Sequence, residues 1–243
     1  MKSETNSTEY GLKEDWDSVQ SSLEQIIPVY DKTNRYISLG SDLRLRKKGI
    51  SLLISELDAP NFTLLDLGSG TGTMTRLFRE KSGADVVMVD PIHEMMRVAL
   101  SKTHEDGLLA VYESLPFREG RIDAAMAAFS LRDARELLRA LIEINKLLRI
   151  DGRFLIVDLT KPDSKAKSWF ISIYWALIAP AIAFLASGRL GLKFGALSKT
   201  YKRLPTISEF FRITREAGFE VSKKEFSMMG GAAIIILRKK LTD

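Results

Sequence analysis

The chain of 243 residues contains no cysteine. This absence excludes disulfide bonds, thiolate nucleophiles and zinc sites built on cysteine. Histidine is nearly absent too, with only His93 and His104, so we expect no metal site. The first ten residues lack the basic and then apolar order of a secretory signal, so we expect the protein to be cytoplasmic.

A strong charge imbalance is also missing. Lysine and arginine number 36 against 31 aspartates and glutamates, a net charge of +5. This surplus could favour anionic membrane lipid or nucleic acid, or simply aid solubility. No stripe of clustered basic residues with interleaved aromatic ones appears, so we expect no nucleic-acid partner. The composition is ordinary for a globular protein, and the length suits one domain spanning 1–243; self-association stays open.

Short apolar runs alternate with amphipathic stretches along the chain. We predict strands at Phe62–Leu67, Asp85–Val89, Leu108–Val111, Ile122–Ala128, Phe154–Val157, Glu220–Phe226 and Ala232–Leu237. Helical spacing occurs at Asp15–Pro28, Ser41–Leu57, Thr73–Lys81, Glu94–Thr103, Ala134–Leu148 and Ser208–Ala217. This alternation predicts an α/β fold with a doubly wound, mostly parallel, seven-stranded sheet. An N-terminal helical segment, 1–58, is expected to cover the site, and a helical insertion, 160–205, follows the fifth strand.

Polar and glycine residues mark several helix ends. Ser41 stands where it can cap the second helix. Thr206 and Glu209 form a capping-box pattern at the start of the last helix, and Gly218 follows where that helix should stop.

A glycine-rich turn follows the first strand, with glycines at positions 68, 70 and 72 after Asp66. Glycine lets the backbone turn tightly and approach a ligand without Cβ contact. The spacing fits neither the dinucleotide fingerprint nor a phosphate-binding P-loop. It suits a ligand that carries an ammonium and a carboxylate but no phosphate. Asp66 would offset the ammonium, and the N–H groups of the turn would receive the carboxylate.

Asp90 ends the second strand, eighteen residues after Gly72. A carboxylate there can accept both ribose hydroxyls of an adenosyl group. The turn and Asp90 together indicate S-adenosylmethionine as the ligand. The alternative, a tightly packed turn with a solvated Asp90, stays open at this point.

Several motifs resemble those of one family. They are Tyr30-Asp31-x-x-Asn34, Ser38-Leu39-Gly40, Leu115-Pro116-Phe117, Arg121-Ile122-Asp123-Ala124 and Ala128-Phe129-Ser130-Leu131-Arg132-Asp133. The chain resembles the UbiE-like C-methyltransferases of ubiquinone and menaquinone biosynthesis from Tyr30 almost to its end. The family often has Asp or Asn where this chain has Val111, and Asn where it has Asp133.

From the turn and the resemblance together, we expect the cofactor to be held by Asp66, Gly68, Ser69, Gly70, Thr71, Asp90, Pro91, Met95, Val111, Tyr112 and Ala128. Val111 cannot bond the adenine amino group. Adenine recognition would then rest on apolar packing and backbone groups near Tyr112, with Glu113 as a possible substitute.

The resemblance implies transfer of a methyl group to a carbon of a hydrophobic, prenylated quinone precursor. Arg132 would stabilise a phenolate, and Asp133 would act as a base or orient a water. The alternative for this pair is structural, with Asp133 capping a helix and Arg132 in a surface ion pair. The expected substrate-binding residues are Tyr30, Asn34, Phe129, Trp169 and Trp175. Methylation of oxygen or nitrogen in another small hydrophobic molecule, and binding of the cofactor without catalysis, are the alternative functions.

The insertion contains an uncharged stretch of eighteen residues, Trp169–Ala186. Basic residues flank it: Lys165, Lys167, Arg189 and Lys193. The stretch is just long enough to span a membrane. However, Pro180 should break or kink the helix, and a span would separate the last strands from their sheet. We expect a lid that binds an apolar substrate or rests on an anionic membrane surface, with an ordinary buried helix pair as the alternative.

Overall fold

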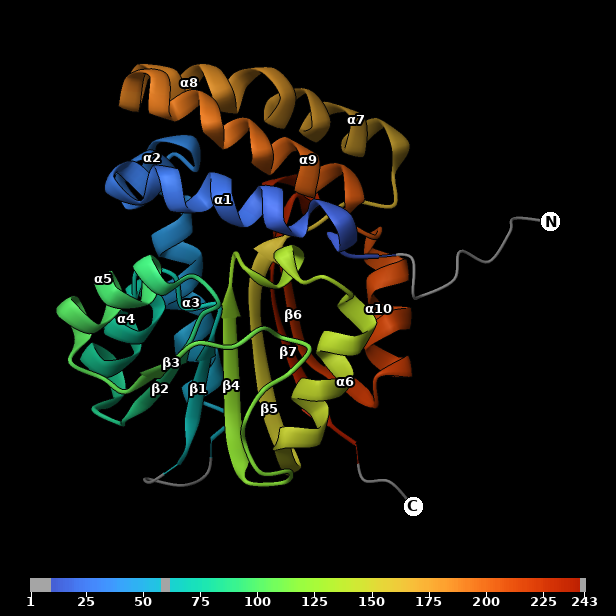
Figure 1. The fold of residues 1–243 in the computed structure, drawn as a ribbon. Helices are drawn as coiled ribbons and strands as arrows, with labels where there is room; N and C mark the ends of the chain where they lie inside the picture. Colours follow the sequence, from blue (N-terminus) through green and yellow to red (C-terminus); the bar gives the residue numbers. More distant parts are fainter. Residues whose placement is uncertain (1–9, 58–61, 241–243) are drawn as a thin grey trace.

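The computed structural model describes residues 10–57 and 62–240. Its strands are β1 (Leu64–Leu67), β2 (Val86–Val89), β3 (Gly107–Leu108), β4 (Ile122–Ala128), β5 (Leu148–Leu159), β6 (Phe219–Ser227) and β7 (Ala232–Lys239). They form one sheet in the order β3-β2-β1-β4-β5-β7-β6 (Figure 1). Only β7 runs antiparallel to its neighbours, β5 and β6. The predicted doubly wound, mostly parallel sheet is confirmed. The order in which strands are added reverses between the parallel strands β1 and β4.

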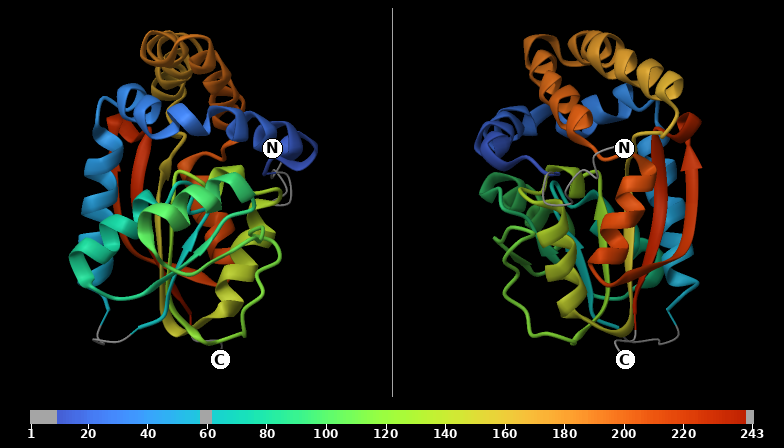
Figure 2. Two further views of the ribbon diagram at one scale, coloured as in Figure 1. Left: turned by 60° about the vertical axis from the view of Figure 1, so that its left-hand side comes forward. Right: turned by 90° about the vertical axis from the view of Figure 1, so that its right-hand side faces the viewer.

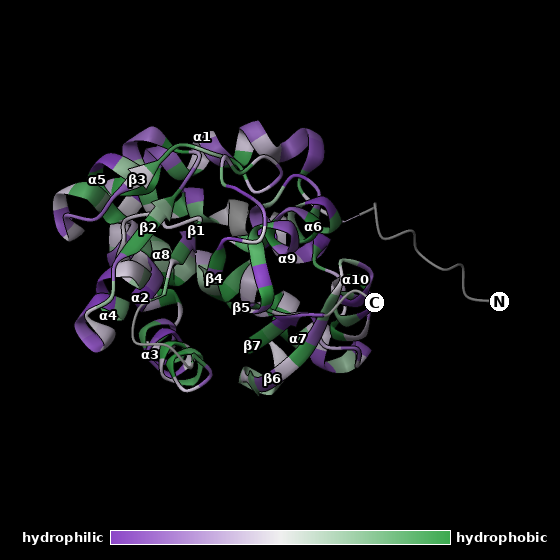
Figure 3. Cartoon of the chain, turned by 90° about the horizontal axis from the view of Figure 1, so that it is seen from below, coloured by the Kyte–Doolittle hydropathy of each residue, from purple (hydrophilic) through white to green (hydrophobic). Residues whose placement is uncertain are grey.

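Helices cover both faces of the sheet because its side chains alternate between the faces. On one face, α3 (Ser41–Ile54) and α4 (Thr73–Ser82) pack on the sheet, and α5 (His93–Thr103) lies over its β2 end. On the other face lie α6 (Leu137–Leu147) and α10 (Ile207–Glu216). Seen from below, hydrophobic residues gather along the central strands and hydrophilic ones on the outer helices (Figure 3).

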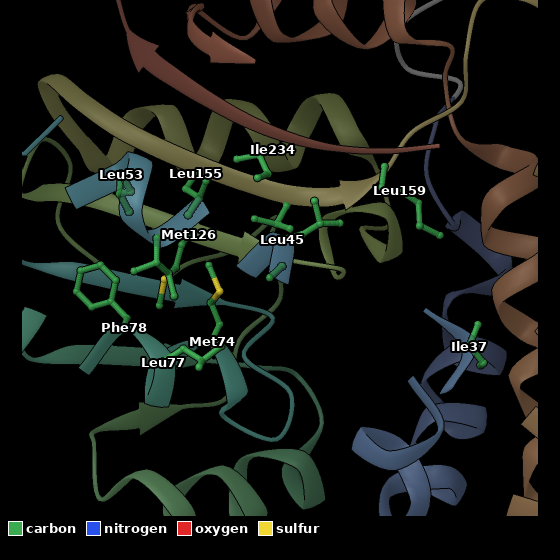
Figure 4. Packing of buried hydrophobic residues seen from close by; sticks show 14 of the residues in the cluster. Ile37, Leu45, Leu53, Met74, Leu77, Phe78, Met126, Leu155, Leu159 and Ile234 are labelled. Carbon is green, nitrogen blue, oxygen red and sulfur yellow. The ribbon is translucent and has the colours of Figure 1, made fainter. Parts of the chain in front are cut away.

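Leu53 of α3 and Phe78 of α4 pack in one hydrophobic cluster with Met126, Leu155 and Ile234 of three neighbouring strands (Figure 4). All five side chains are almost completely buried. This core fixes the positions of β1 and β4. A doubly wound fold binds its ligand at the carboxyl ends of these two strands.

A roof of helices lies over the carboxyl ends of the strands (Figures 1 and 2). It consists of α1 (Trp16–Ile26), α2 (Tyr30–Ile37), α7 (Lys165–Ile173), α8 (Ala179–Ser187) and α9 (Ala196–Arg203). The hydroxyl groups of Thr33 and Ser187 join α2 to α8 at 2.5 Å. The N-terminal segment and the insertion, far apart in sequence, therefore form one cover. Segment 1–58 was predicted to cover the site, but most of α3 lies along a face of the sheet instead.

Several predicted boundaries were wrong. A third N-terminal helix, α2, follows Pro28 after a short 3-10 turn. Ser41 does not cap α3, because Gly40 adopts a left-handed conformation before it and the Ser41 hydroxyl donates to the Ser38 carbonyl at 2.6 Å. Val111 lies outside β3 in an isolated bridge with Ser114.

The segment around Arg132 also differs from its prediction. Leu131–Asp133 form a 3-10 turn, and α6 begins only at Leu137, with Glu136 as its N-cap residue. Asp133 therefore does not cap a helix. By contrast, the capping box of Thr206 and Glu209 is confirmed at the start of α10, and Gly218 ends that segment with φ of 85°.

Pro180 does not break the insertion helix. A π-helical turn, Tyr174–Ile178, comes just before it and accommodates its missing N–H. By length and composition Lys165–Gly195 could cross a membrane, and 17% of its most apolar window is buried in the protein. However, the chain reverses at Gly188, and the 3-10 segment Gly188–Gly195 packs back onto α8. The two strands after the insertion, β6 and β7, join the same sheet as the strands before it. This arrangement favours a helical roof on the protein over a membrane-spanning helix.

Gly191 allows the 3-10 segment Gly188–Gly195 to lie close against α8. A Cβ at Gly191 would lie 1.9 Å from the Ala183 carbonyl oxygen, a backbone atom that cannot swing aside. We expect Gly191→Ala to reduce the free energy of unfolding in denaturant by about 1–3 kcal/mol. Gly195→Ala is the matched control, because its Cβ would have nothing within 4 Å. Equal stability of the two variants would contradict the packing described here.

Candidate functional site

The glycine turn depends on left-handed backbone at Gly68, Gly70 and Gly72, with φ of 64°, 57° and 79°. A Cβ at Gly68 would lie 2.5 Å from the Cβ of Ser130. A Cβ at Gly70 would have nothing within 4 Å. Gly68 therefore packs on the floor of the site, whereas Gly70 borders open space.

Asp66 lies beneath this turn. Its Oδ2 accepts hydrogen bonds from the Thr75 backbone N–H at 3.0 Å and the Thr75 hydroxyl at 2.6 Å, in the first turn of α4. Burial raises the pKa of Asp66 to about 6, although the bonds from Thr75 oppose that rise. Its Oδ1 is buried and has no partner among the described residues. Asp66 supports the helix that opens the site, and it does not line the hollow above.

Asp90 at the end of β2 does line that hollow. Its two oxygens accept from the backbone N–H groups of Gly70 and Ile92, each at 2.8 Å. Burial raises the pKa of Asp90 to about 6, and these two bonds oppose the rise. Each carboxylate oxygen keeps a free lone pair, so Asp90 can still accept ribose hydroxyls.

We call the space above the turn the cofactor hollow. Among its walls are seven predicted cofactor residues: Gly68, Gly70, Asp90, Pro91, Met95, Val111 and Tyr112. Of the other four, Ser69, Thr71 and Ala128 border the adjoining space over the turn, whereas Asp66 lines neither space. Trp16, Gln20 and Leu23 of α1 close the hollow from above and were not predicted individually. The sequence predicted that this segment is helical. It did not show which part of the protein the inner face of α1 would contact.

Tyr112 and Glu113 complete the far wall. The Tyr112 hydroxyl donates to the Leu67 carbonyl at 2.8 Å, and burial raises the pKa of Tyr112 well above its usual value. Glu113 lines the hollow beside Val111 and accepts from the Glu136 N–H at 3.1 Å. A carboxylate is thus available close to where Val111 offers no polar group.

The residues of the hollow fit S-adenosylmethionine. Asp90 suits the ribose, and Met95 and Val111 provide apolar contact for an aromatic base. Ser69 Oγ and Asp133 Oδ1 are buried without a hydrogen-bond partner among the described residues, as expected of groups that a polar ligand would satisfy.

The roof is tied to this turn through Asp31 of α2. The Thr71 hydroxyl donates to Asp31 at 2.6 Å, and Lys102 of α5 pairs with the other oxygen of Asp31 at 3.0 Å. These bonds connect α2 to the glycine turn and to α5, beside the cofactor hollow. They give a structural role to the second residue of the Tyr30-Asp31 motif.

A second space, which we call the acceptor hollow, lies next to the first. Four predicted substrate residues line it: Tyr30, Asn34, Phe129 and Trp175. Tyr30 and Phe129 line both hollows, so the two meet at these side chains. The structure does not bring Trp169 there, because it lies outside the acceptor hollow on α7 with 60% of its surface exposed.

Phe129 holds an unusual conformation at this junction. Its φ is 59°, a left-handed value that costs energy for an aromatic residue, and its N–H donates to the Val157 carbonyl at 2.7 Å. The guanidinium carbons of Arg46 and Arg132 lie 5.0 and 6.0 Å from the centre of its ring. Two cations therefore hold the ring that separates the hollows.

Arg132 is almost fully buried and paired with Asp158 at the end of β5. Its Nη1 lies 2.6 Å from one Asp158 oxygen, and its backbone N–H donates to the other at 3.3 Å. Burial opposes the charge of Arg132, but Asp158 and Asp133 outweigh burial and raise the pKa of the guanidinium. Asp158 was missed in the sequence, although the rule that selected Asp90, an acidic residue at a strand end, also applies to it.

Asp133 and Tyr30 meet this arginine at the junction. Asp133 Oδ1 lies 3.9 Å from Arg132 Nε, and burial raises the pKa of Asp133 to about 6 against the effect of Arg132. Burial also raises the pKa of Tyr30, while Arg132, Arg46 and a hydrogen bond with Asn34 lower it. Arg132 lines the acceptor hollow and Asp133 the cofactor hollow, so the predicted pair stands on both sides of the junction.

We expect Asp90→Asn to weaken the binding of S-adenosylmethionine by about 10- to 100-fold, because an amide accepts the ribose hydroxyls less well than a carboxylate. Affinity for the wild-type protein should fall as the pH drops through about 6, because Asp90 becomes protonated. Titration calorimetry with S-adenosylmethionine and its demethylated product measures both effects. Asp85→Asn, an exposed carboxylate before β2, is the control; equal affinity of the two variants would contradict this role.

Comparisons with solved structures agree with the fold. A putative sarcosine dimethylglycine methyltransferase from Galdieria sulphuraria matches with a TM-score of 0.61 at 14% identity, over 82% of this chain and 86% of its own. The [4+2]-cyclase SpnF matches with a TM-score of 0.59 at 18% identity, over 81% of both chains. Because a cyclase shares the fold, these matches alone do not define the reaction.

Comparisons of sequence are more specific. The demethylmenaquinone methyltransferase of Thermus thermophilus is 31% identical over 216 residues, covering 86% of this chain and 96% of its own. A ubiquinone/menaquinone biosynthesis C-methyltransferase UbiE of Campylobacter jejuni is 28% identical, covering 89% and 95%. The profile of the ubiE/COQ5 methyltransferase family matches residues 10–239. The chain therefore belongs to the ubiE/COQ5 methyltransferase family and is an S-adenosylmethionine-dependent methyltransferase.

Proposed function

We propose that this methyltransferase adds a methyl group to a ring carbon of a hydrophobic quinol that carries a prenyl tail. The meeting of the two hollows at Tyr30 and Phe129 is the observation that carries the proposal. The acceptor hollow has apolar walls, including Leu45, Leu159 and Trp175, that suit a flat aromatic ring. The relatives named for demethylmenaquinone and for C-methylation support the same choice.

Asp90 and the glycine turn would hold S-adenosylmethionine, which would supply an electrophilic methyl group; that group would pass from its sulfur to the ring carbon. The protein contributes alignment and the exclusion of water. Phe129 and Tyr30 provide rigid walls where the two reactants must meet. The roof closes the space above them, with Trp175 on the acceptor side.

The ring becomes nucleophilic only when its hydroxyl loses a proton. In this proposal, Asp133 accepts that proton directly or through one water, and Asp158 holds Arg132 beside it. After the transfer, the methylated carbon releases its proton to solvent. The ring oxygen then recovers the proton held by Asp133, so the reaction yields a neutral methylated quinol and one free proton.

We expect the wild-type protein to methylate chemically reduced demethylmenaquinone, with activity that rises with pH through about 6 as Asp133 ionises. Asp133→Ala should lower kcat by about 100-fold and leave the affinity for S-adenosylmethionine unchanged. Mass spectrometry of the product and titration calorimetry measure the two effects. Asp17→Ala on the exposed side of α1 is the control; an equal loss of cofactor binding and turnover would refute the assignment of Asp133.

We also propose that the protein works in the cytoplasm at the surface of an anionic membrane, from which it draws its substrate. The outer side of the insertion exposes large apolar residues: Trp169, Phe170, Leu177, Ile178, Phe184, Leu185, Leu190 and Leu192. The basic residues Lys165, Lys167, Arg189 and Lys193 are exposed beside them. Apolar area together with lysine and arginine is the combination that binds an anionic bilayer surface, at about 1 kcal/mol for each basic residue.

The purified protein should therefore sediment with vesicles that contain anionic lipid, and less so at high salt. Leu177→Glu with Leu185→Glu, at positions that are 67% and 84% exposed, should abolish most of this binding. Leu109→Glu, 51% exposed beyond β3 and outside the insertion, is the control. Full recovery of the wild-type protein in the supernatant at low salt would contradict the proposal.

A further inference from the structure

We infer that Arg46 of α3 binds the ionised oxygen of the acceptor and is the anion-binding residue of the acceptor hollow. The inference deepens the proposed function and rests on it for the identity of the acceptor. Arg46 was not among the residues that the sequence pointed to.

The position of Arg46 is the first argument. Its side chain lines both the acceptor hollow and the space over the glycine turn. Its guanidinium lies 5.0 Å from the centre of the Phe129 ring, at the junction where the acceptor must meet the methyl group. A group held by Arg46 would therefore lie beside the reacting atoms.

The charges around the two arginines are the second argument. Arg132 faces Asp158 at 2.6 Å and Asp133 at 3.9 Å, so its charge is largely matched before any ligand binds. Arg46 forms no ion pair with any described residue. Its Nη2 donates a hydrogen bond to the Ala128 carbonyl at 3.3 Å. Among the described residues, Arg46 is thus the less neutralised of the two cations at the junction.

The unused hydrogen-bonding capacity of Arg46 is the third argument. Its Nε is buried and has no partner among the described residues. Asp42, one turn earlier on α3, lines the same hollow but accepts instead from the Ser38 hydroxyl at 2.8 Å. A buried N–H without a partner is costly unless a ligand supplies an acceptor. An ionised ring oxygen supplies both an acceptor and a negative charge.

The side chain of Tyr30, which also lines the acceptor hollow, shows the effect of Arg46 on a nearby hydroxyl group. Burial raises the pKa of Tyr30, and Arg46 is one of the two arginines that lower it. An acceptor hydroxyl placed beside Tyr30 would experience the same positive field, which favours its ionised form. Asp133 would then remove the proton, and Arg46 would stabilise the charge that is left.

Binding of two quinone probes tests this inference without turnover. 2-Hydroxy-1,4-naphthoquinone is an anion at neutral pH, whereas 1,4-naphthoquinone is neutral and of nearly the same shape. The chain has no cysteine that could add to either probe. Arg46→Gln should weaken binding of the anion by about 10- to 100-fold and leave binding of the neutral probe unchanged. Arg46→Lys, which keeps the charge, should lose less than tenfold.

Turnover of reduced demethylmenaquinone gives a second measurement. Arg46→Gln should lower kcat by about 100-fold and move the rising limb of the pH profile to higher pH, because the acceptor hydroxyl loses its stabilising cation. Arg44→Gln, on the exposed side of the same helix, is the matched control and should behave as wild type in both assays.

The outcomes separate this inference from the proposed function. If Arg46→Gln weakens binding of the anionic probe alone, Arg46 binds the anion. This conclusion holds even if the wild type fails to methylate the quinol. An active wild type whose Arg46→Gln variant binds both probes normally overturns the inference and leaves the proposed function standing. An equal loss of affinity for both probes would also overturn the inference, because that result indicates that Arg46 acts through packing.

Discussion

The architecture of the site depends on the left-handed backbone of Phe129 at the end of β4. This conformation turns the chain sharply after the strand, so the ring remains at the junction while Arg132 and Asp133 follow in a tight 3-10 turn. The N–H bond to Val157 of β5 and the two guanidinium groups hold this strained conformation in place. Without it, the cofactor hollow and the acceptor hollow would not share a wall.

Buried charge is the second organising feature. Asp66, Asp90 and Asp133 are buried close to the cofactor hollow, and burial raises the pKa of each to about 6. Buried carboxylates are unfavourable unless positive charge or N–H donors offset them. The protein provides backbone N–H groups, Thr75 and Arg132, and a cationic cofactor would add to these. Binding of a sulfonium ligand and ionisation of these carboxylates should therefore favour each other.

The sequence predicted the parts of the site that local patterns encode. Alternating apolar runs predicted the sheet, and the spacing of glycine and aspartate predicted the turn, Asp90 and most of the cofactor hollow. It could not show the charge partners, because Asp158 reaches Arg132 only after β5 lies beside β4. Trp169 and Trp175 look alike in sequence, yet the helix between them turns one outward and the other inward. Which face of α3 presents Arg46 to the site also depends on tertiary packing.

The central claim is that the two hollows bring a methyl donor and a flat hydrophobic ring together so that a ring carbon is methylated. The most direct test is nuclear magnetic resonance of the product formed from S-adenosylmethionine with an isotope-labelled methyl group and reduced demethylmenaquinone. We expect the labelled methyl carbon to be bonded to a ring carbon. A label bonded to oxygen, or no transfer by a protein that binds S-adenosylmethionine, would contradict it.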